Sequence, residues 1–325
     1  MSPAVLGIDV SKDKLDVILR QGEKQRHYQV ANTPSGYERL VEWLQRARVE
    51  ELHACLEATG HYGEGVAQHL YEQGYQVSVV NPARIKAYGD SKLRHNKSDP
   101  ADAALIALFC EREQPTLWTP PEESVRELQA LVRHLDDLKN TRQQQRNRLQ
   151  AGISSPRVRA DLEALITFLD KQIEALLREI ERHIGRHPDL KQQHELLKSI
   201  PGIGALTAAV LLGEVRDIRG FGSARQLAAY AGLVPKQYDS GSSVHKKPRL
   251  AKRGNAHLRK ALYMPALVAM KYNPLMQALR ERMAKTGHST MAIIGAVMRK
   301  LLHLAYGVIK TGKPFDPHHA CSATA

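Results

Sequence analysis

Four acidic residues in the first third of the chain have the type and placement to bind a divalent cation. Asp9 interrupts one apolar run, and Glu57 ends another. An ionised carboxylate in such a run is costly to bury unless it is paired or bound to a metal. Asp99 and Asp102 are three residues apart at the predicted start of a helix, which puts them on one helical face. Asp99 alone has a commoner interpretation, as a helix N-cap with Pro100 in the first position.

The order of these acids makes the combination informative. One falls on the first predicted strand, one on the fourth, and two on the helix after the fifth. If these elements are neighbours in an RNase H-like sheet, the four carboxylates converge, and they repel one another unless a divalent cation neutralises them. Oxygen ligands suit Mg²⁺ or Mn²⁺. Two such ions about 3.5–4 Å apart would clamp a phosphodiester.

A serine-rich segment offers a second kind of chemistry. Residues 238–247 read YDSGSSVHKK, and such a segment is usually a solvated loop. A hydroxyl beside a phosphate-binding cluster can become a nucleophile if its proton has somewhere to go. The residues alone leave the choice open among Ser240, Ser242 and Ser243. The basic residues that follow are Lys246, Lys247, Arg249, Lys252, Arg253, Arg259 and Lys260.

The positive charge is confined to the end of the chain. Residues 236–325 contain 16 basic and three acidic residues, so the whole formal net charge of +13 arises there. Such a distribution indicates a polyanionic partner, although charge alone does not separate DNA, RNA and an anionic membrane surface. The apolar stretches at 261–270 and 291–298 are too short to span a bilayer, so we expect a cytoplasmic protein without a membrane partner.

The elements that must position the acids follow from the pattern of apolar residues. The prediction is a mixed α/β sheet covered by helices, in the order βββαβαβα. The predicted strands are residues 5–10, 15–20, 27–31, 53–57 and 76–80, and the predicted helices are residues 36–46, 63–73 and 100–112.

Three prolines between residues 115 and 121 predict a domain boundary. We therefore expect three domains, at residues 1–114, 115–190 and 191–325. The middle one contains two long helical patterns, at 122–150 and 158–184. The second carries an apolar seam that fits either a helical hairpin on its own chain or a dimerising coiled coil. The seam residues are Leu162, Leu165, Leu169, Ile173, Leu176, Ile180 and Ile184.

The last third is predicted to be mostly α-helical, with helices at 257–272 and 289–309. It opens with SIPGIG, in which Gly202 and Gly204 lie between helical patterns. This spacing is typical of a helix-hairpin-helix segment, whose turn directs backbone N–H groups toward a phosphate. A simple helix–helix turn is the alternative.

Several motifs resemble those of one protein family, in the family's order and over nearly the whole chain. The family is the DEDD-type insertion-sequence transposases named for element one-ten, which are related to the Piv DNA invertases. LGIDVSKDKLDV, LEATG, VVNP and NKSDPADA resemble its RuvC-like domain. IPGIG, FGSARQLAAYAGLVP, YDSGSS and RKALYMPALVA resemble its C-terminal transposase domain.

The resemblance implies specific roles. Asp9, Glu57, Asp99 and Asp102 fall on the family's metal-binding tetrad, and Ser240 falls on its catalytic serine. The serine would attack a DNA phosphate and form a covalent phosphoserine link, while the acids hold Mg²⁺. The resemblance also implies dimers that pair into a tetramer, a noncoding bridge RNA as guide, and donor and target double-stranded DNA as substrates.

Competing hypotheses remain. A junction-resolvase-like nuclease would use the four acids and water, with Ser240 as a loop residue. A non-enzymatic nucleic-acid scaffold would use the acids only for capping and pairing. An actin-like kinase would need a second, duplicated sheet, which the helical second half does not predict.

Overall fold

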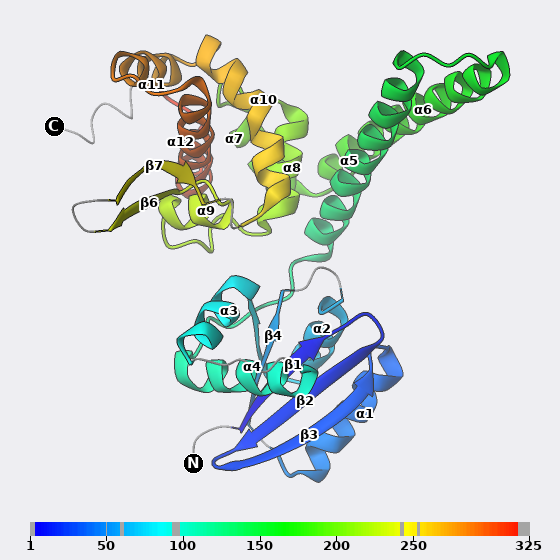
Figure 1. The fold of residues 1–325 in the computed structure, drawn as a ribbon, viewed down its shortest axis with the longest axis vertical. Helices are drawn as coiled ribbons and strands as arrows, with labels where there is room; N and C mark the ends of the chain where they lie inside the picture. Colours follow the sequence, from blue (N-terminus) through cyan, green and yellow to red (C-terminus); the bar gives the residue numbers. More distant parts are fainter. Residues whose placement is uncertain are drawn as a thin grey trace. The chain divides into compact units, whose positions relative to one another are not determined.

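The computed structural model describes residues 4–49, 51–58, 62–92, 98–240, 244–251 and 254–317, with the backbone alone for residues 236–240 and 244–249. The chain divides into two compact units, Met1–Pro120 and Pro121–Ala325 (Figure 1). The first unit contains the sheet, and the second is mainly helical. The helices of residues 115–190 belong to the second unit, so a separate middle domain stays a prediction.

The first unit is built on a five-stranded mixed sheet in the order β3-β2-β1-β4-β5. The first three strands are antiparallel, whereas β1, β4 and β5 run parallel. The predicted mixed α/β sheet is therefore confirmed. The strands are β1 (Ala4–Val10), β2 (Lys14–Gln21), β3 (Lys24–Ala31), β4 (Leu52–Glu57) and β5 (Gln76–Val80).

Helices cover both faces of this sheet. On one face, α1 (Pro34–Arg46) and α2 (Glu64–Glu72) bury their apolar stripes against the strands. On the other face lie α3 (Pro82–Ser91) and α4 (Asp99–Glu113). Helix α3 is absent from the sequence-based prediction. Its start depends on local chemistry rather than periodicity, because the side chain of Asn81 accepts a hydrogen bond from the first turn.

A glycine lets α4 lie directly against β1. A Cβ atom at Gly7 would overlap the carbonyl oxygen of Ala103 and the amide nitrogen of Ala107. Successive side chains alternate between the two faces of a strand, so Asp9 is on the same face as Gly7. Asp102 precedes Ala103. The close contact at Gly7 therefore brings the first turn of α4 to the end of β1.

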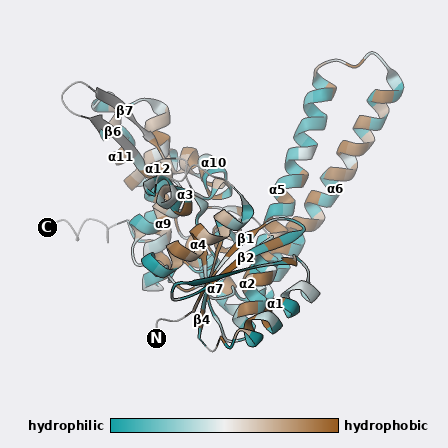
Figure 2. Ribbon diagram, turned by 60° about the horizontal axis from the view of Figure 1, so that its bottom comes forward, coloured by the Kyte–Doolittle hydropathy of each residue, from teal (hydrophilic) through white to brown (hydrophobic). Residues whose placement is uncertain are grey.

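The second unit begins with two long helices, α5 (Glu123–Gln150) and α6 (Pro156–Arg186), that pack on each other as a helical hairpin would (Figure 1). Figure 2 shows hydrophobic segments recurring along α6. Leu165 of the predicted seam is 40% exposed, and a dimerising coiled coil stays a prediction. The seam residues buried in the unit are Leu162, Leu169, Ile173, Ile180 and Ile184.

Six further helices form the core of the second unit together with the root of the α5–α6 pair. Helix α12 is long and apolar enough to cross a membrane by length and composition, yet 56% of its most apolar window is buried within the unit. That burial is typical of a core helix. The helices are α7 (Pro188–Lys198), α8 (Ala205–Val215), α9 (Ala224–Tyr230), α10 (Ala256–Tyr272), α11 (Pro274–Lys285) and α12 (Thr290–Thr311).

After residue 235 the chain forms a two-stranded hairpin that the sequence analysis did not predict. Strands β6 (Pro235–Ser240) and β7 (Val244–Leu250) pair antiparallel, with Ser240 opposite Val244. The sequence hid this hairpin because its residues are mainly polar and cationic and lack a clear apolar alternation. The guanidinium of Arg259 donates hydrogen bonds to the carbonyl oxygens of Ala231, Gly254 and Asn255, which fixes the root of the hairpin.

Candidate active site

Two of the predicted acids lie side by side on neighbouring strands. The parallel register of β1 and β4 pairs Ile8 with Leu56, so the next residues along are Asp9 and Glu57. Side chains at adjacent positions of paired strands lie on the same face. Both residues are half-buried. They stand at the carboxyl ends of their strands, where open α/β sheets place their sites.

The other two acids come from the first turn of α4. The N-cap interpretation of Asp99 is wrong: Ser98 is the N-cap and Asp99 is already helical. The reason is that the amide of Asp102 donates a 2.9 Å hydrogen bond to the carbonyl oxygen of Ser98, so the first turn starts one residue earlier than expected. Acids are favoured there by the helix dipole. The helix dipole therefore stabilises the ionised carboxylates of Asp99 and Asp102 at the end of α4 that faces Asp9.

The protonation of Asp9 indicates how close these charges lie. The pKa of Asp9 is raised from 3.8 to about 6, first by burial and then by the negative charges of Asp102, Asp99 and Asp16. The ammonium group of Lys14 opposes this increase. Carboxylates from β1 and α4 are therefore close enough to repel each other.

The sequence analysis did not predict two charged residues beside the acids, Lys14 and Asp16 on β2. Asp16 is directly opposite Asp9 in the antiparallel register and is only 2% exposed. The ammonium nitrogen of Lys14 lies 3.0 Å from Asp16 and 2.7 Å from the carboxylate of Asp99. The tight turn between β1 and β2 was the available signal, because it fixes the register that pairs Asp9 with Asp16.

Asp16 is an anchored carboxylate rather than a free ligand. Burial would raise its pKa, but hydrogen bonds from Lys14, His27 and Gln29 outweigh that effect and hold the pKa below its ordinary value. The nitrogen atoms of His27 and Gln29 lie 3.0 Å from its oxygens. Asp16 therefore stays ionised and keeps Lys14 over the site.

The chemistry of the acids fits a hard divalent cation. Carboxylate oxygens are the ligands that Mg²⁺ and Mn²⁺ prefer, and Asp9 is held among like charges that a cation would relieve. In the described part of the chain, no three His, Cys, Asp or Glu side chains form a group that could hold a metal ion as they stand. Lys14 already pairs with Asp99, so cation binding requires this ammonium to move.

These protonation states predict a pH-dependent change in stability. Because folding raises the pKa of Asp9 to about 6, the folded state loses stability as pH rises from 3.8 to about 6 and does not regain it above. Asp9→Asn mimics the protonated acid. We expect it to stabilise the chain above pH ~6 by about 1 kcal/mol after solvent screening, without divalent cations. Thermal unfolding between pH ~4 and ~8 measures the difference, which should vanish at the acidic end.

Asp16→Asn is the matched control and should act in the opposite direction. Folding lowers the pKa of Asp16, so its ionised form stabilises the protein above the ordinary pKa and this contribution disappears as pH falls. The variant should therefore be less stable than the parent at neutral pH. Equal stability of Asp9→Asn and the parent across the pH range would contradict the crowding of carboxylates at this site.

The structure places part of the predicted serine segment. Ser240 is the last residue of β6, and Lys246, Lys247 and Arg249 fall on β7. Two of the other cations have structural partners: Arg259 fixes the hairpin root, and the ammonium of Lys260 lies 2.6 Å from Asp136. Four sequence-predicted candidates fall outside the described residues, namely Ser242, Ser243, Lys252 and Arg253.

The glycines of the PGIG segment have different surroundings. Gly202 has a φ of +108°, and a Cβ there would lie 2.6 Å from the Cβ of Ala269 on α10. Close packing therefore explains this glycine, as in a simple helix–helix turn. Gly204 is the N-cap of α8 and is exposed. A phosphate contact at Gly202 or Gly204 stays a prediction.

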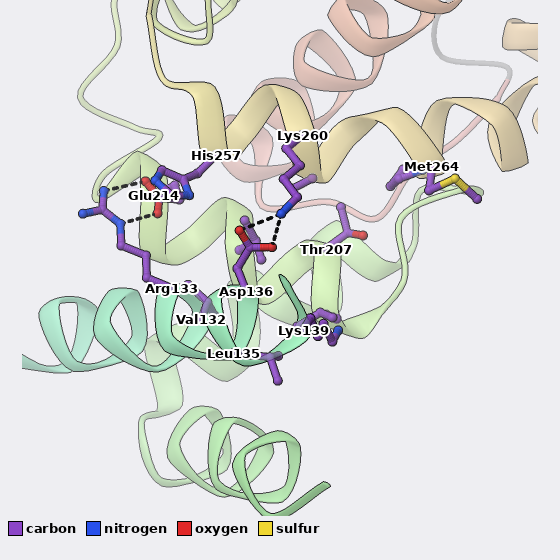
Figure 3. A pocket seen from close by; sticks show the side chains of 14 residues that line it. Val132, Arg133, Leu135, Asp136, Lys139, Thr207, Glu214, His257, Lys260 and Met264 are labelled. Atoms are coloured by element: carbon purple, nitrogen blue, oxygen red, sulfur yellow. Dashed lines mark hydrogen bonds and ion pairs between the residues drawn. The ribbon is translucent and has the colours of Figure 1, made fainter. Parts of the chain in front are cut away.

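The second unit also contains a pocket of about 400 Å³ between α5, α8 and α10 (Figure 3). Its main charges are paired: Arg133 bonds Glu214 at 2.7 Å, and Lys260 bonds Asp136. Glu214 is 1% exposed and also accepts a hydrogen bond from Asn255, the N-cap of α10. We therefore interpret this network as structural, since it joins three helices.

Comparison with known proteins agrees with both units. A family model described as a transposase matches residues 6–155, and a second, described as transposase IS116/IS110/IS902 family, matches residues 194–281. A pilin gene-inverting protein of Moraxella bovis is 35% identical over 97% of this chain and 98% of its own length. The chain belongs to the IS110 family of transposases. The family named by the sequence motifs is thus confirmed.

Other relatives of this IS110-family chain include further transposases. The transposase for insertion sequence element IS1328 of Yersinia enterocolitica is 28% identical over 77% of this chain and 82% of its own length. Among solved structures, T. thermophilus RuvC in complex with a Holliday junction substrate is similar to 36% of this chain, with 18% identity and a TM-score of 0.28.

Proposed function

We propose that this transposase cuts and rejoins DNA through a covalent link between Ser240 and a DNA phosphate, with the acids of the first unit acting on the same phosphate. The observation that carries the proposal is the convergence of Asp9, Asp99 and Asp102 at the end of β1, with Glu57 beside Asp9. The full-length similarity to a gene-inverting protein supports strand rejoining rather than cutting alone.

The covalent route keeps the bond energy of the phosphodiester. The hydroxyl oxygen of Ser240 attacks phosphorus, the bond from phosphorus to the 3′ oxygen breaks, and the 5′ end stays on the serine as a phosphodiester. The serine proton leaves and the departing 3′ oxygen gains one. Attack by a 3′ hydroxyl on the phosphoserine reverses these changes and joins strands without ATP. The hydroxyl of a serine is a weak nucleophile at neutral pH, so the attack needs a group that accepts its proton or stabilises charge on the phosphate.

The acids would hold the divalent cation of this reaction. Asp9, Glu57, Asp99 and Asp102 supply the oxygen ligands, and Mg²⁺ bound there would neutralise charge on the phosphate. Lys14 fills a related role before binding, because its ammonium group balances part of the negative charge at Asp99 and Asp16. Asp16 holds Lys14 next to the site throughout.

Partners follow from charge and from family resemblance. The net charge of +13 within residues 236–325 supports binding to nucleic acid, and we propose a noncoding guide RNA together with donor and target duplex DNA. We further propose a dimer that pairs into a tetramer, in which the acids of one chain serve the Ser240 of another. The proposed location is the cytoplasm, at the nucleoid.

Trapping the covalent intermediate tests the proposal. Active protein is incubated with Mg²⁺, guide RNA and a nicked DNA substrate whose cut fragment can diffuse away. We expect a protein–DNA adduct that survives denaturation and is absent when RNA or Mg²⁺ is omitted. Cleavage without any adduct would instead support the hydrolytic, junction-resolvase-like alternative, in which water replaces Ser240.

A further inference from the structure

Helix α12 carries a basic surface that none of the site residues above includes. Arg299, Lys300 and His303 occupy positions i, i+1 and i+4, so Arg299 and His303 lie on the same helical face. Arg299 and Lys300 are half-buried. Helix α9 packs against α12 and contributes Arg225, which is exposed. We call these four residues the α9–α12 cation cluster.

Contacts further along α12 fix which face it turns toward α9. The hydroxyl of Tyr306 donates a 3.1 Å hydrogen bond to the carbonyl oxygen of Phe221, just before α9. The ammonium of Lys310 donates a 2.8 Å hydrogen bond to the carbonyl oxygen of Arg219. Tyr306 and Lys310 follow His303 by three and seven residues, so all three share one face. His303 therefore points toward the α9 side of the helix.

Within the described part of the chain, the cluster has no counter-charge. Among the described residues, Arg225, Arg299 and Lys300 form no ion pair. The Nε2 atom of His303 is buried and has no hydrogen-bond partner in the described part of the chain. The pKa of His303 is lowered, first by burial and then by the charges of Arg299, Lys300 and Arg225. The positive charges of Arg225, Arg299 and Lys300 act together on His303, and a bound anion would relieve the repulsion among them.

The β6–β7 hairpin is rooted against the same helix. Gly295 of α12 is close enough to Leu250, the last residue of β7, that a Cβ there would lie 3.1 Å from the Leu250 side chain. Arg299 follows Gly295 by one helical turn and lies on the same face. Figure 1 shows α9, α12 and the hairpin close together in the second unit. The cluster therefore lies near the base of the hairpin whose first strand, β6, ends at Ser240.

We propose that Arg225, Arg299 and Lys300, which surround the ring of His303, bind a backbone phosphate of the DNA strand that Ser240 attacks. This inference rests on the proposed function for its substrate. Arginine and lysine supply charge-assisted hydrogen bonds to phosphate oxygens. The cluster positions DNA without reading its sequence, as phosphate contacts do.

The dimensions allow one DNA segment to reach both places. Strand β6 has six residues, Pro235–Ser240, and the five steps between its ends span about 17 Å at ~3.3 Å per step. One strand of a DNA duplex advances ~3.4 Å per nucleotide, so this length corresponds to about five nucleotides. A strand lying along the hairpin would thus present a second phosphate near the cluster while Ser240 faces the first.

Salt-dependent binding of DNA tests the assignment. The full chain carrying Ser240→Ala binds a labelled DNA duplex without cutting it, so the result does not depend on serine chemistry. We compare it with the same chain that also carries Arg299→Gln and Lys300→Gln. Binding is measured between ~50 and ~200 mM salt, and we expect the slope of log K against log salt to fall by about 2 and the affinity by at least about tenfold. Arg225→Gln alone, on the exposed side, should lower the slope by about 1.

The matched control removes two cations from the first unit. Lys24→Gln with Arg26→Gln on the exposed strand β3 has the same loss of charge and should leave the slope unchanged. The proposal would be overturned if this control lowered the salt slope as much as the Arg299→Gln, Lys300→Gln variant does. It would also be overturned if the slope of that α12 variant were unchanged while its thermal unfolding matched the parent. A variant that loses binding to single-stranded RNA but binds the DNA duplex as before would also overturn the proposal. Stabilisation by inorganic phosphate without any change in DNA binding would assign the cluster to a free anion.

Discussion

Replacing Ser240 by alanine is expected to abolish the covalent protein–DNA adduct and to lower strand transfer by at least ~10⁴-fold. The reason is that alanine has no oxygen to attack phosphorus, whereas the rest of the site is retained. Ser240 ends β6, and a side chain smaller by one oxygen does not disturb the backbone pairing with Val244. DNA binding and thermal unfolding should therefore be unchanged. Denaturing electrophoresis of labelled DNA measures the adduct.

Two neighbouring serines provide the matched controls for this prediction. Ser242→Ala and Ser243→Ala remove the same hydroxyl from the same segment and should retain the adduct. The residues alone left the three serines equivalent, and the family motif selects Ser240. If Ser242→Ala or Ser243→Ala lost the adduct while Ser240→Ala kept it, the covalent mechanism would hold but its nucleophile would be misassigned.

The fold of the first unit was largely predictable because its signals are local. Alternating apolar runs predicted all five strands, and short polar turns predicted the antiparallel start of the sheet. The placement of Asp9 and Glu57 on neighbouring strands was expected only on the condition that the sheet is RNase H-like, and the pairing of β1 with β4 bears it out. The positions of Lys14 and Asp16 beside the acids could not be predicted, because they depend on strand register and on a contact between Lys14 and Asp99, which are 85 residues apart. Tertiary pairing of this kind leaves no periodic signal.

The second unit was harder to predict for related reasons. The hairpin of β6 and β7 has a polar sequence, so its periodicity did not predict strands, and its root is fixed by contacts from Arg259 and between Leu250 and α12. Gly202 also has a packing role, shown by its close approach to Ala269, that spacing alone cannot reveal, and its predicted contact with phosphate stays a prediction. The uneven charge was visible in the composition. The sequence did not show that Arg299 and Arg225 lie in one cluster, because they belong to different helices.

The second large effect concerns Asp102, and it has a readout that is independent of activity. Mg²⁺ should raise the melting temperature of the parent chain, because a ligand that binds only the folded state stabilises it. Asp102→Asn removes one negative charge from the first turn of α4 and should lose most of this Mg²⁺-dependent increase. Removing a ligand should also lower strand transfer by at least ~10²-fold. Asp90→Asn, at the end of α3, is the control of equal charge and should behave like the parent.

Mixing the two inactive variants then shows which chains share a site. If the acids of one chain serve the serine of another, an assembly of Asp102→Asn and Ser240→Ala chains contains some sites with intact acids and an intact serine. Strand transfer should then reappear on mixing, with the adduct formed only on the Asp102→Asn chain, since that chain alone has the hydroxyl. Sites made within a single chain would always lack one component. No recovery in mixed assemblies, with each variant folded and DNA-bound, would place both components in one chain.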